Sequence, residues 1–302
     1  MKQLSALVYL LLSTLPALAA DATQEIQACD RALQSGAYAE AAQHAELALR
    51  AAPDSRHAYL CLGRAQGEAG KHAEAVAALQ AAGKLATQPT EHIVALTLLG
   101  NQHLSVRAYP EAAEIYRQSL AIARSAGIVR FQHINLNQLG ETLEGSGDVA
   151  GALEHYQQGM QLAANENERA DSNARIAAAY SLLGEHDKAI EHQFKAMLQE
   201  ERSGDLNHYA NANIELGRIS LAAGQYAYAE KWLGKFLAAI AQSKVPYWEA
   251  RGRYLLGKVK AAQGKGSEAA EQFALSKGLA EQAGDAQLLK DISSSAAAEK
   301  PM

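Results

Sequence analysis

Proline is scarce in this sequence of 302 residues, with 6 in all, and aromatic residues make up only 6% of the chain. Hydrophobic residues nevertheless account for 48%, and alanine and leucine dominate them. Because proline interrupts helices while alanine and leucine favour them, this composition predicts an all-α chain.

Long runs of basic residues are also absent, and the formal net charge is −5. A protein that binds nucleic acid through its charge needs a clustered basic surface, so we expect no nucleic-acid partner. A glycine-rich phosphate loop, a His-Glu-x-x-His pattern and a Cys-x-x-Cys pattern are missing as well. These absences argue against nucleotide, zinc-protease and thioredoxin-type chemistry, and we expect no cofactor.

The amino-terminal segment differs from the rest of the chain. Lys2 precedes an almost wholly apolar run over residues 4–15, and Pro16 is followed by small residues. This pattern is typical of a cleaved signal peptide, and the run is shorter than the roughly 20 apolar residues of a membrane-spanning helix. We therefore expect a signal peptide over residues 1–19 and an exported protein, periplasmic or secreted, without stable membrane insertion after cleavage.

One phrase recurs along the remaining chain: Leu-Gly, a glycine seven residues later, and an alanine five residues after that. Self-similarity at a fixed period indicates a repeat architecture. The clearest copies begin at Leu62, Leu139, Leu216 and Leu256, and weaker ones at Ala28, Leu99 and Ile176. The closing alanines of the seven copies are residues 41, 75, 112, 152, 189, 229 and 269, at spacings of 34 to 40 residues.

Each part of the phrase has a physical role in a pair of helices. The first glycine lets two helices approach closely, and the second ends the first helix, where positive φ is needed. Apolar residues then follow at steps of three and four, which is helical periodicity. We expect helix–helix contacts without room for a side chain at Gly63, Gly140, Gly217 and Gly257.

The repeats resemble the tetratricopeptide repeat from about Ala22 to Gly284, and the later copies resemble the roughly 40-residue variety of kinesin light chains. The second copy follows the family pattern at Tyr59, Leu62, Gly63, Gly70 and Ala75. The resemblance implies a right-handed α-solenoid of about seven helix pairs over residues 20–285. The copies depart from the pattern at Arg107 for a turn glycine, Gln193 for an apolar residue and Gly266 for an aromatic one.

The chain beyond the last pair should close the array. We expect a capping helix from Ala286 to Ile292, with Leu288 and Leu289 facing inward, followed by a frayed tail to Met302.

The two cysteines and ten histidines offer little for catalysis. Cys29 and Cys61 should lie close together in the first helices of neighbouring pairs, where a disulfide is possible but two buried thiols are the simpler interpretation. His57 and Cys61 share a helix face, yet no third residue orients them as a nucleophile requires. His72 and His186 stand at turn positions that are aromatic in other copies, so we expect them to substitute for aromatic side chains.

The family resemblance also implies a binding surface, since the first helices of such pairs line a concave groove that receives a peptide. An ordinary solvated helix face is the alternative for the same positions. The arginines, with Tyr254, would form a cationic wall suited to an acidic segment or a free carboxylate. The positions carried over are Asn101, Asn137, Gln138, Arg175, Asn211, Glu215, Arg218, Arg251, Tyr254 and Lys258.

Together these features predict a non-enzymatic scaffold that binds a partner protein or peptide. A peptide-sensing receptor or regulatory module is the alternative, and an enzyme is poorly supported.

Overall fold

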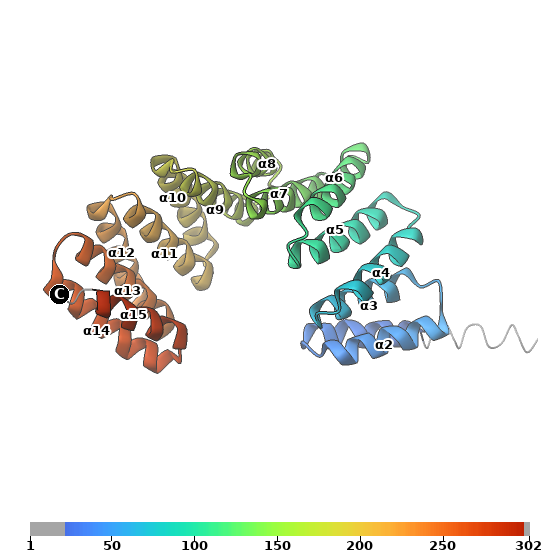
Figure 1. Cartoon of the computed structure of the whole chain (residues 1–302), viewed down its shortest axis with the longest axis horizontal. Coiled ribbons are helices and arrows are strands. Elements are labelled where there is room, and N and C mark those ends of the chain that lie inside the picture. Colours follow the sequence, from blue (N-terminus) through green and yellow to red (C-terminus); the bar gives the residue numbers. More distant parts are fainter. Residues whose placement is uncertain (1–21, 299–302) are drawn as a thin grey trace, which may run out of the picture. The chain divides into compact units, whose positions relative to one another are not determined.

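The computed structural model of the chain describes residues 22–298, in which all regular secondary structure is helical (Figure 1). The expected signal peptide lies outside the described residues. Contacts divide the chain into two units, one up to Leu162 and one from Ala163, which are described separately below. The all-α class and the succession of helix pairs predicted from the repeats are confirmed.

The amino-terminal unit holds four pairs, in which consecutive helices pack against each other. We call the earlier helix of each pair its first helix and the later one its second helix. The first pair begins with a helix over residues 22–34. The other helices are α2 (Tyr38–Ala51), α3 (Arg56–Glu68), α4 (His72–Lys84), α5 (Pro89–Ser105), α6 (Tyr109–Ser125), α7 (Val129–Ser146) and α8 (Val149–Gln161).

The carboxy-terminal unit holds three further pairs and a closing helix, again with consecutive helices in contact. Its first helices are α9 (Glu166–Leu182), α11 (Leu206–Ala222) and α13 (Pro246–Ala262). Its second helices are α10 (His186–Ser203), α12 (Tyr226–Ile240) and α14 (Gly266–Ala283), and α15 (Ala286–Ala298) follows them.

Every first helix ends in a residue with left-handed backbone, as the turn glycines predict. Gly184 is typical, with φ of 75°. Its N–H donates to the carbonyl of Ser181, and the next N–H, that of Glu185, donates to the carbonyl of Tyr180. This pair of bonds satisfies carbonyls that the end of a helix leaves free. The other turn residues with positive φ are Gly36, Gly70, Arg107, Gly147, Gly224 and Gly264.

Each phrase glycine lies in a first helix and packs against a side chain of the second helix of the same pair, sixteen residues later in the sequence. A Cβ at Gly140 would lie 2.4 Å from Cε1 of Tyr156, and one at Gly257 would lie 2.6 Å from Cε1 of Phe273. These distances are too short for a real side chain, so the prediction of helix contacts without spare room is confirmed. The full set of such pairs is Gly63 with Leu79, Gly100 with Tyr116, Gly140 with Tyr156, Gly217 with Leu233 and Gly257 with Phe273.

The seven alanines that end the repeated phrase lie at the start of the packing face of the second helices, as expected. Each of them is fully buried, with no exposed surface. A larger side chain at these positions would hold the two helices of a pair apart. They are Ala41, Ala75, Ala112, Ala152, Ala189, Ala229 and Ala269.

The two cysteines form a disulfide rather than remaining as buried thiols. Cys29 and Cys61 have Cα atoms 6.5 Å apart, which lies within the range for such a bond. The expected proximity is confirmed, and the preference for free thiols is wrong. In the first pair the residue sixteen positions after Cys29 is the small Ala45, and the disulfide joins the same buried cluster.

The closing helix is longer than predicted, because α15 continues six residues past Ile292 to Ala298. Leu288 and Ile292 are buried, and Leu289 packs at the edge of the same cluster. The expectation of a frayed tail from residue 293 is therefore wrong up to residue 298. Leu288, Leu289 and Ile292 recur at helical spacing and pack the first turns of α15 against the last pair.

The contact at Gly140 yields a stability prediction. Gly140→Ala should lower the free energy of unfolding by about 1–3 kcal/mol, because Tyr156 is buried and has nowhere to withdraw. Gly83→Ala is the matched control in the same unit, since its Cβ would meet the Cβ of Ala95 at an ordinary 3.7 Å. That variant should gain up to about 1 kcal/mol from helix propensity. Urea unfolding curves measure both, and equal effects of the two substitutions would refute the assigned contact.

The disulfide yields a second prediction. Denatured, unreduced protein should show no free thiol, and the double variant Cys29→Ala, Cys61→Ala should be less stable. The expected loss is about 3–4 kcal/mol, the chain-entropy value for a separation of 32 residues. Thiol titration and urea unfolding test the two statements, and two titratable thiols in the unreduced protein would exclude the bond.

Candidate functional site

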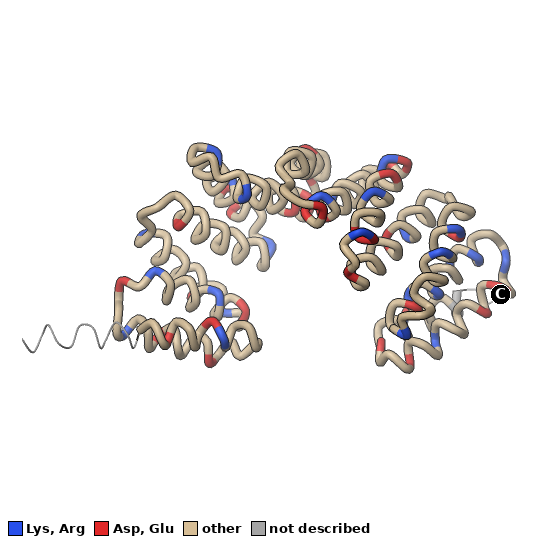
Figure 2. The backbone as a smooth tube through the Cα atoms, turned by 180° about the vertical axis from the view of Figure 1, so that it is seen from behind, with Lys and Arg blue, Asp and Glu red and all other residues tan. Residues whose placement is uncertain are grey.

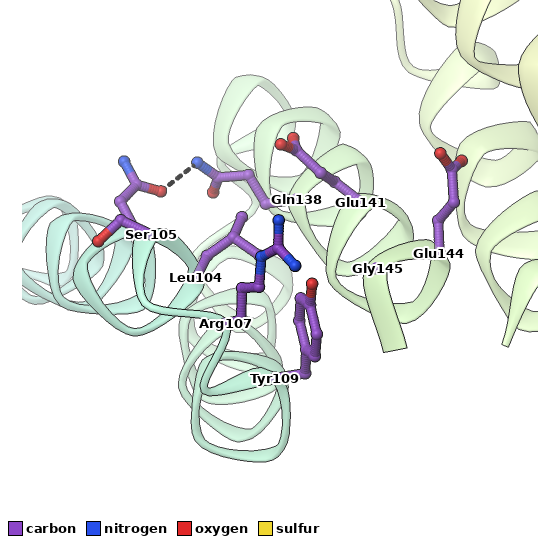
Figure 3. A pocket seen from close by; sticks show the side chains of 9 residues that line it. Leu104, Ser105, Arg107, Tyr109, Gln138, Glu141, Glu144 and Gly145 are labelled. Atoms are coloured by element: carbon purple, nitrogen blue, oxygen red, sulfur yellow. Dashed lines mark hydrogen bonds between the residues drawn. The ribbon is translucent and has the colours of Figure 1, made fainter. Parts of the chain in front are cut away.

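The amino-terminal unit contains a polar pocket of about 550 Å³ beside the turn between α5 and α6, opposite α7 (Figure 3). Two of the three amide residues predicted for the groove in this region, Asn101 and Gln138, line it. The remaining lining residues are Leu104, Ser105, Arg107, Tyr109, Glu141, Glu144 and Gly145.

Asn101 is the centre of a hydrogen-bond network in this pocket. Its Oδ1 accepts from the hydroxyl of Tyr116 at 2.6 Å and from Nε2 of Gln138 at 2.7 Å. Tyr116 is fully buried, and burial raises the pKa of its hydroxyl, which therefore stays protonated as a donor. Because Gln138 uses its amide nitrogen here, its Oε1 is left buried without a hydrogen-bond partner in the described part of the chain.

Arg107 and Tyr109 are pocket residues that our groove assignment missed. Figure 3 shows both side chains projecting from the turn between α5 and α6 toward the helix that carries Gln138. Arg107 is exposed, and it makes no ion pair with any residue between 22 and 298. Tyr109 lies against Gly145, where a Cβ would be 2.5 Å from its ring.

The sequence did carry a signal for Arg107. It occupies a turn position that is glycine in the other copies, and its φ of 60° is costly for a residue with a side chain. Backbone strain of this kind concentrates at functional sites, so the departure from glycine could have marked this position as more than a structural variation.

The pocket offers hydrogen-bond groups of several kinds rather than a reactive centre. Arg107 supplies donors, Asn101 and Gln138 supply amides, and Glu141 and Glu144 supply carboxylates at the far wall. Amides and guanidinium groups suit a peptide backbone and its carbonyls. Figure 2 shows basic and acidic segments interspersed in both units, without an extended stretch of one sign.

Residues 22–298 contain no group of three or more histidines, cysteines or carboxylates placed to hold a metal ion. Cys61 is bonded to Cys29, so the pair of His57 and Cys61 offers no thiolate while that bond persists. His72 is partly buried and packs edge-on against His103, with ring centroids 5.3 Å apart, as a substitute for an aromatic residue would. No helix within the described residues is both long and apolar enough to span a membrane.

Asn137 does not lie on an open groove face. Its Nδ2 is 3.1 Å from Nε2 of His133, and its Oδ1 is buried beside Gly159 of α8. The predicted placement of Asn137 is therefore corrected: this position faces the second helix of its own pair.

Four predicted residues belong to the first helices α9 and α11. Asn211, Glu215 and Arg218 line a second, smaller pocket, in which Nε of Arg218 donates to Oε2 of Glu215 at 2.7 Å. Arg175 is half-buried on α9 and is not among the residues that line this pocket. The structure thus places three of these four predicted residues around one pocket.

At the end of the predicted groove, two of the three predicted residues contact α15 or the residue that precedes it. Arg251 is held by Asp285, with NH2 of the guanidinium 2.9 Å from Oδ2 of a nearly buried carboxylate. The hydroxyl of Tyr254 hydrogen-bonds to Ser295 of α15 at 3.1 Å, and only Lys258 is exposed. Because Arg218 and Arg251 both carry acidic partners, the predicted wall of available cations is not present at these two positions.

Comparisons with known proteins fit this architecture. A tetratricopeptide repeat family model matches residues 95–129, which cover most of α5 and α6. A structure of kinesin-light-chain-type repeats from Podospora anserina superposes with a TM-score of 0.58 at 19% identity, covering 65% of this chain and 99% of that one.

Residues 95–129 match the tetratricopeptide repeat family, and the described chain shares the fold of such repeat proteins.

Two further comparisons define how far the likeness extends. A signal-transduction ATPase with a tetratricopeptide repeat sensor from Pyrococcus horikoshii gives a TM-score of 0.69 at 17% identity, with 89% of this chain and 44% of that one covered. A curated relative, Photosystem I assembly protein Ycf3 of Synechococcus sp. (strain CC9605), is 30% identical over 96 residues, which are 31% of this chain. The match spans only about half of that relative, 54% of its length.

The strained turn at Arg107 yields a third prediction. Arg107→Gly should raise the free energy of unfolding by about 0.5–1 kcal/mol, because glycine adopts positive φ without the cost that a side chain brings. The reciprocal change Gly147→Arg, at the same turn of the next pair, should lower it by a similar amount. Urea unfolding checks both, and a destabilising Arg107→Gly would mean that Arg107 makes a structural contact.

Proposed function

We propose that this protein is an exported, non-enzymatic scaffold that holds a partner protein against the first helices of its repeats. Tetratricopeptide repeats bind proteins, and the match to that family over residues 95–129 supports protein binding by this chain.

The observation that carries the proposal is the pocket between α5 and α7. It combines the exposed guanidinium of Arg107, which forms no ion pair within residues 22–298, with a buried amide oxygen of Gln138 that has no hydrogen-bond partner among the same residues. A buried polar atom without a hydrogen bond costs about 1–3 kcal/mol, which a bound donor would recover. A peptide backbone supplies N–H donors for Gln138 and carbonyl acceptors for Arg107.

The acidic partner expected from the sequence would need cations that this chain already pairs with its own carboxylates. Arg218 and Arg251 pair with carboxylates of this chain, so neither guanidinium is available without breaking an ion pair. We therefore propose backbone recognition at the α5–α7 pocket, with Arg107 contacting a carbonyl or carboxylate, rather than an acidic segment along the whole array.

Two observations support export. The apolar amino-terminal segment has the pattern of a signal peptide, and the disulfide between Cys29 and Cys61 suits an oxidising compartment. The relatives named as photosystem assembly proteins support a role in bringing proteins together, although the match covers about half of their length.

The binding proposal is tested with Arg107→Gly, which removes the guanidinium and relieves the turn. Mature wild-type and variant proteins capture partners from the envelope fraction of the native host, and quantitative mass spectrometry compares what each retains. The variant should lose most of the principal partner while being at least as stable as wild type. Lys244→Gly is the control, because Lys244 also has positive φ but lies outside the pocket.

Retention of the partner by a folded Arg107→Gly variant would contradict binding at this pocket. Intact-mass measurement of the same protein recovered from its host tests export. We expect a chain that lacks residues 1–19, and a mass that retains them would contradict cleavage.

A further inference from the structure

The smaller pocket of the carboxy-terminal unit lies between the first helices α9 and α11, with α10 at its base. Its volume is about 190 Å³, below the several hundred Å³ that enclose a whole small-molecule ligand. A pocket of this size fits one long side chain. Its lining includes Asp171, Ala174, Ala178, Gln193, Glu200 and Ala212.

The pocket exists because the first helix of the fifth pair has smaller side chains on this face than the other first helices have. Ala174 lies three residues before, and Ala178 one residue after, the place of the phrase glycine, here Ala177. Every other copy carries a larger side chain at both positions. The residues that match Ala174 are Ile26, Leu60, Thr97, Asn137, Ile214 and Tyr254, and those that match Ala178 are Asp30, Arg64, Asn101, Glu141, Arg218 and Lys258.

Gln193 introduces a polar amide where every other pair except the first has a large aliphatic or aromatic side chain. It stands sixteen residues after Ala177, at the position that Tyr156 and Leu233 fill elsewhere. Only 3% of Gln193 is exposed, and its Nε2 donates to the carbonyl of Ala212 at 3.0 Å. Its Oε1 makes no hydrogen bond within the part of the chain that the structure describes, so this acceptor is available to a ligand.

Glu200 adds a carboxylate to the same pocket. The residue is 7% exposed, and its Oε2 accepts from the hydroxyl of Ser203 at 3.2 Å and lies 3.7 Å from Nδ1 of His208. Asp171 is exposed at the rim on α9 and forms no ion pair with the described residues. The remaining carboxylate of the pocket, Glu215, is paired with Arg218. Acceptors thus outnumber donors in this pocket.

We infer that this pocket receives a lysine or arginine side chain of the partner protein. The methylene stem would lie along Ala174, Ala178 and Ala212, as the stems of long basic side chains do on apolar surfaces. The charged head would donate to Oε1 of Gln193 and to Glu200, which forms a charge-assisted hydrogen bond in a site largely removed from water. This inference rests on the proposed function of protein binding and specifies the chemistry of the partner.

The test uses four capped pentapeptides, acetyl-Gly-Ser-X-Ser-Gly-amide, in which X is lysine, arginine, norleucine or glutamate. Backbone amide shifts of ¹⁵N-labelled mature protein around Gln193 and Glu200 report binding. The lysine and arginine peptides should saturate these shifts with dissociation constants of about 1 mM, which is ordinary for one side chain. Norleucine keeps the stem but lacks the charge, so it should bind about tenfold more weakly, and glutamate should not bind.

Two variants identify the groups responsible. Glu200→Gln keeps the shape and the bond from Ser203, and it should weaken the lysine peptide by about tenfold. Ala178→Leu fills the pocket and should abolish binding. Ala238→Leu, at an exposed position of α12 outside the pocket, is the matched control and should bind as wild type does. Circular dichroism verifies that each variant is folded.

Equal binding of norleucine and lysine, or full affinity in Glu200→Gln, would overturn the inference. So would the absence of any shift near Gln193 with all four peptides. The partner capture that tests the α5–α7 pocket does not depend on these outcomes. A wild-type protein that captures its partner but ignores the lysine peptide refutes only this inference, whereas a folded Arg107→Gly variant with full capture refutes only the proposed function.

Discussion

The contact between a first-helix glycine and the side chain sixteen residues later is the interaction on which the rest of the structure depends. At Gly100, a Cβ would lie 2.5 Å from the ring of Tyr116, so the second helix can approach only because the side chain is missing. This close approach aligns the two helices of a pair and sets the face that each presents to the next pair. Since a lone pair cannot cover its own apolar face, the stacking of pairs then follows from the shared core.

The two candidate binding sites lie where a copy departs from this pattern. In the third pair an arginine replaces the turn glycine, and the strained residue places a guanidinium at the edge of a polar pocket. In the fifth pair the phrase glycine becomes Ala177 and its large partner becomes Gln193, so an opening remains where other pairs have packed side chains. The regular copies hold the fold, and the irregular copies expose groups that can bind.

Much of the fold was predictable because it depends on residues close in sequence. The turn glycines, the buried alanines and the glycine contacts each follow from spacing within one copy, and the structure places all of them as expected. The ion pair of Arg251 was not predictable in this way, because its partner Asp285 lies 34 residues further along the chain. Asp285 stands directly before α15 and accepts a hydrogen bond from the N–H of Leu288. The predicted placement of Asn137 was wrong for a related reason, since its neighbour Gly159 belongs to the second helix of its pair. The pattern within one repeat identifies which positions face another helix, but it does not identify which residue the side chain contacts there.

The most direct test of this account is a double-mutant cycle between Ala177 and Gln193, measured by urea unfolding. If small and large residues sixteen apart are coupled, Ala177→Gly alone should destabilise through lost helix propensity, and Gln193→Leu alone should destabilise through a clash with the Cβ of Ala177. Combined, the two changes recreate the arrangement of Gly63 with Leu79, so the double variant should be more stable than the sum of the single changes predicts. We expect a coupling energy of about 1–3 kcal/mol. Additive effects of the two substitutions would contradict the central role of this contact.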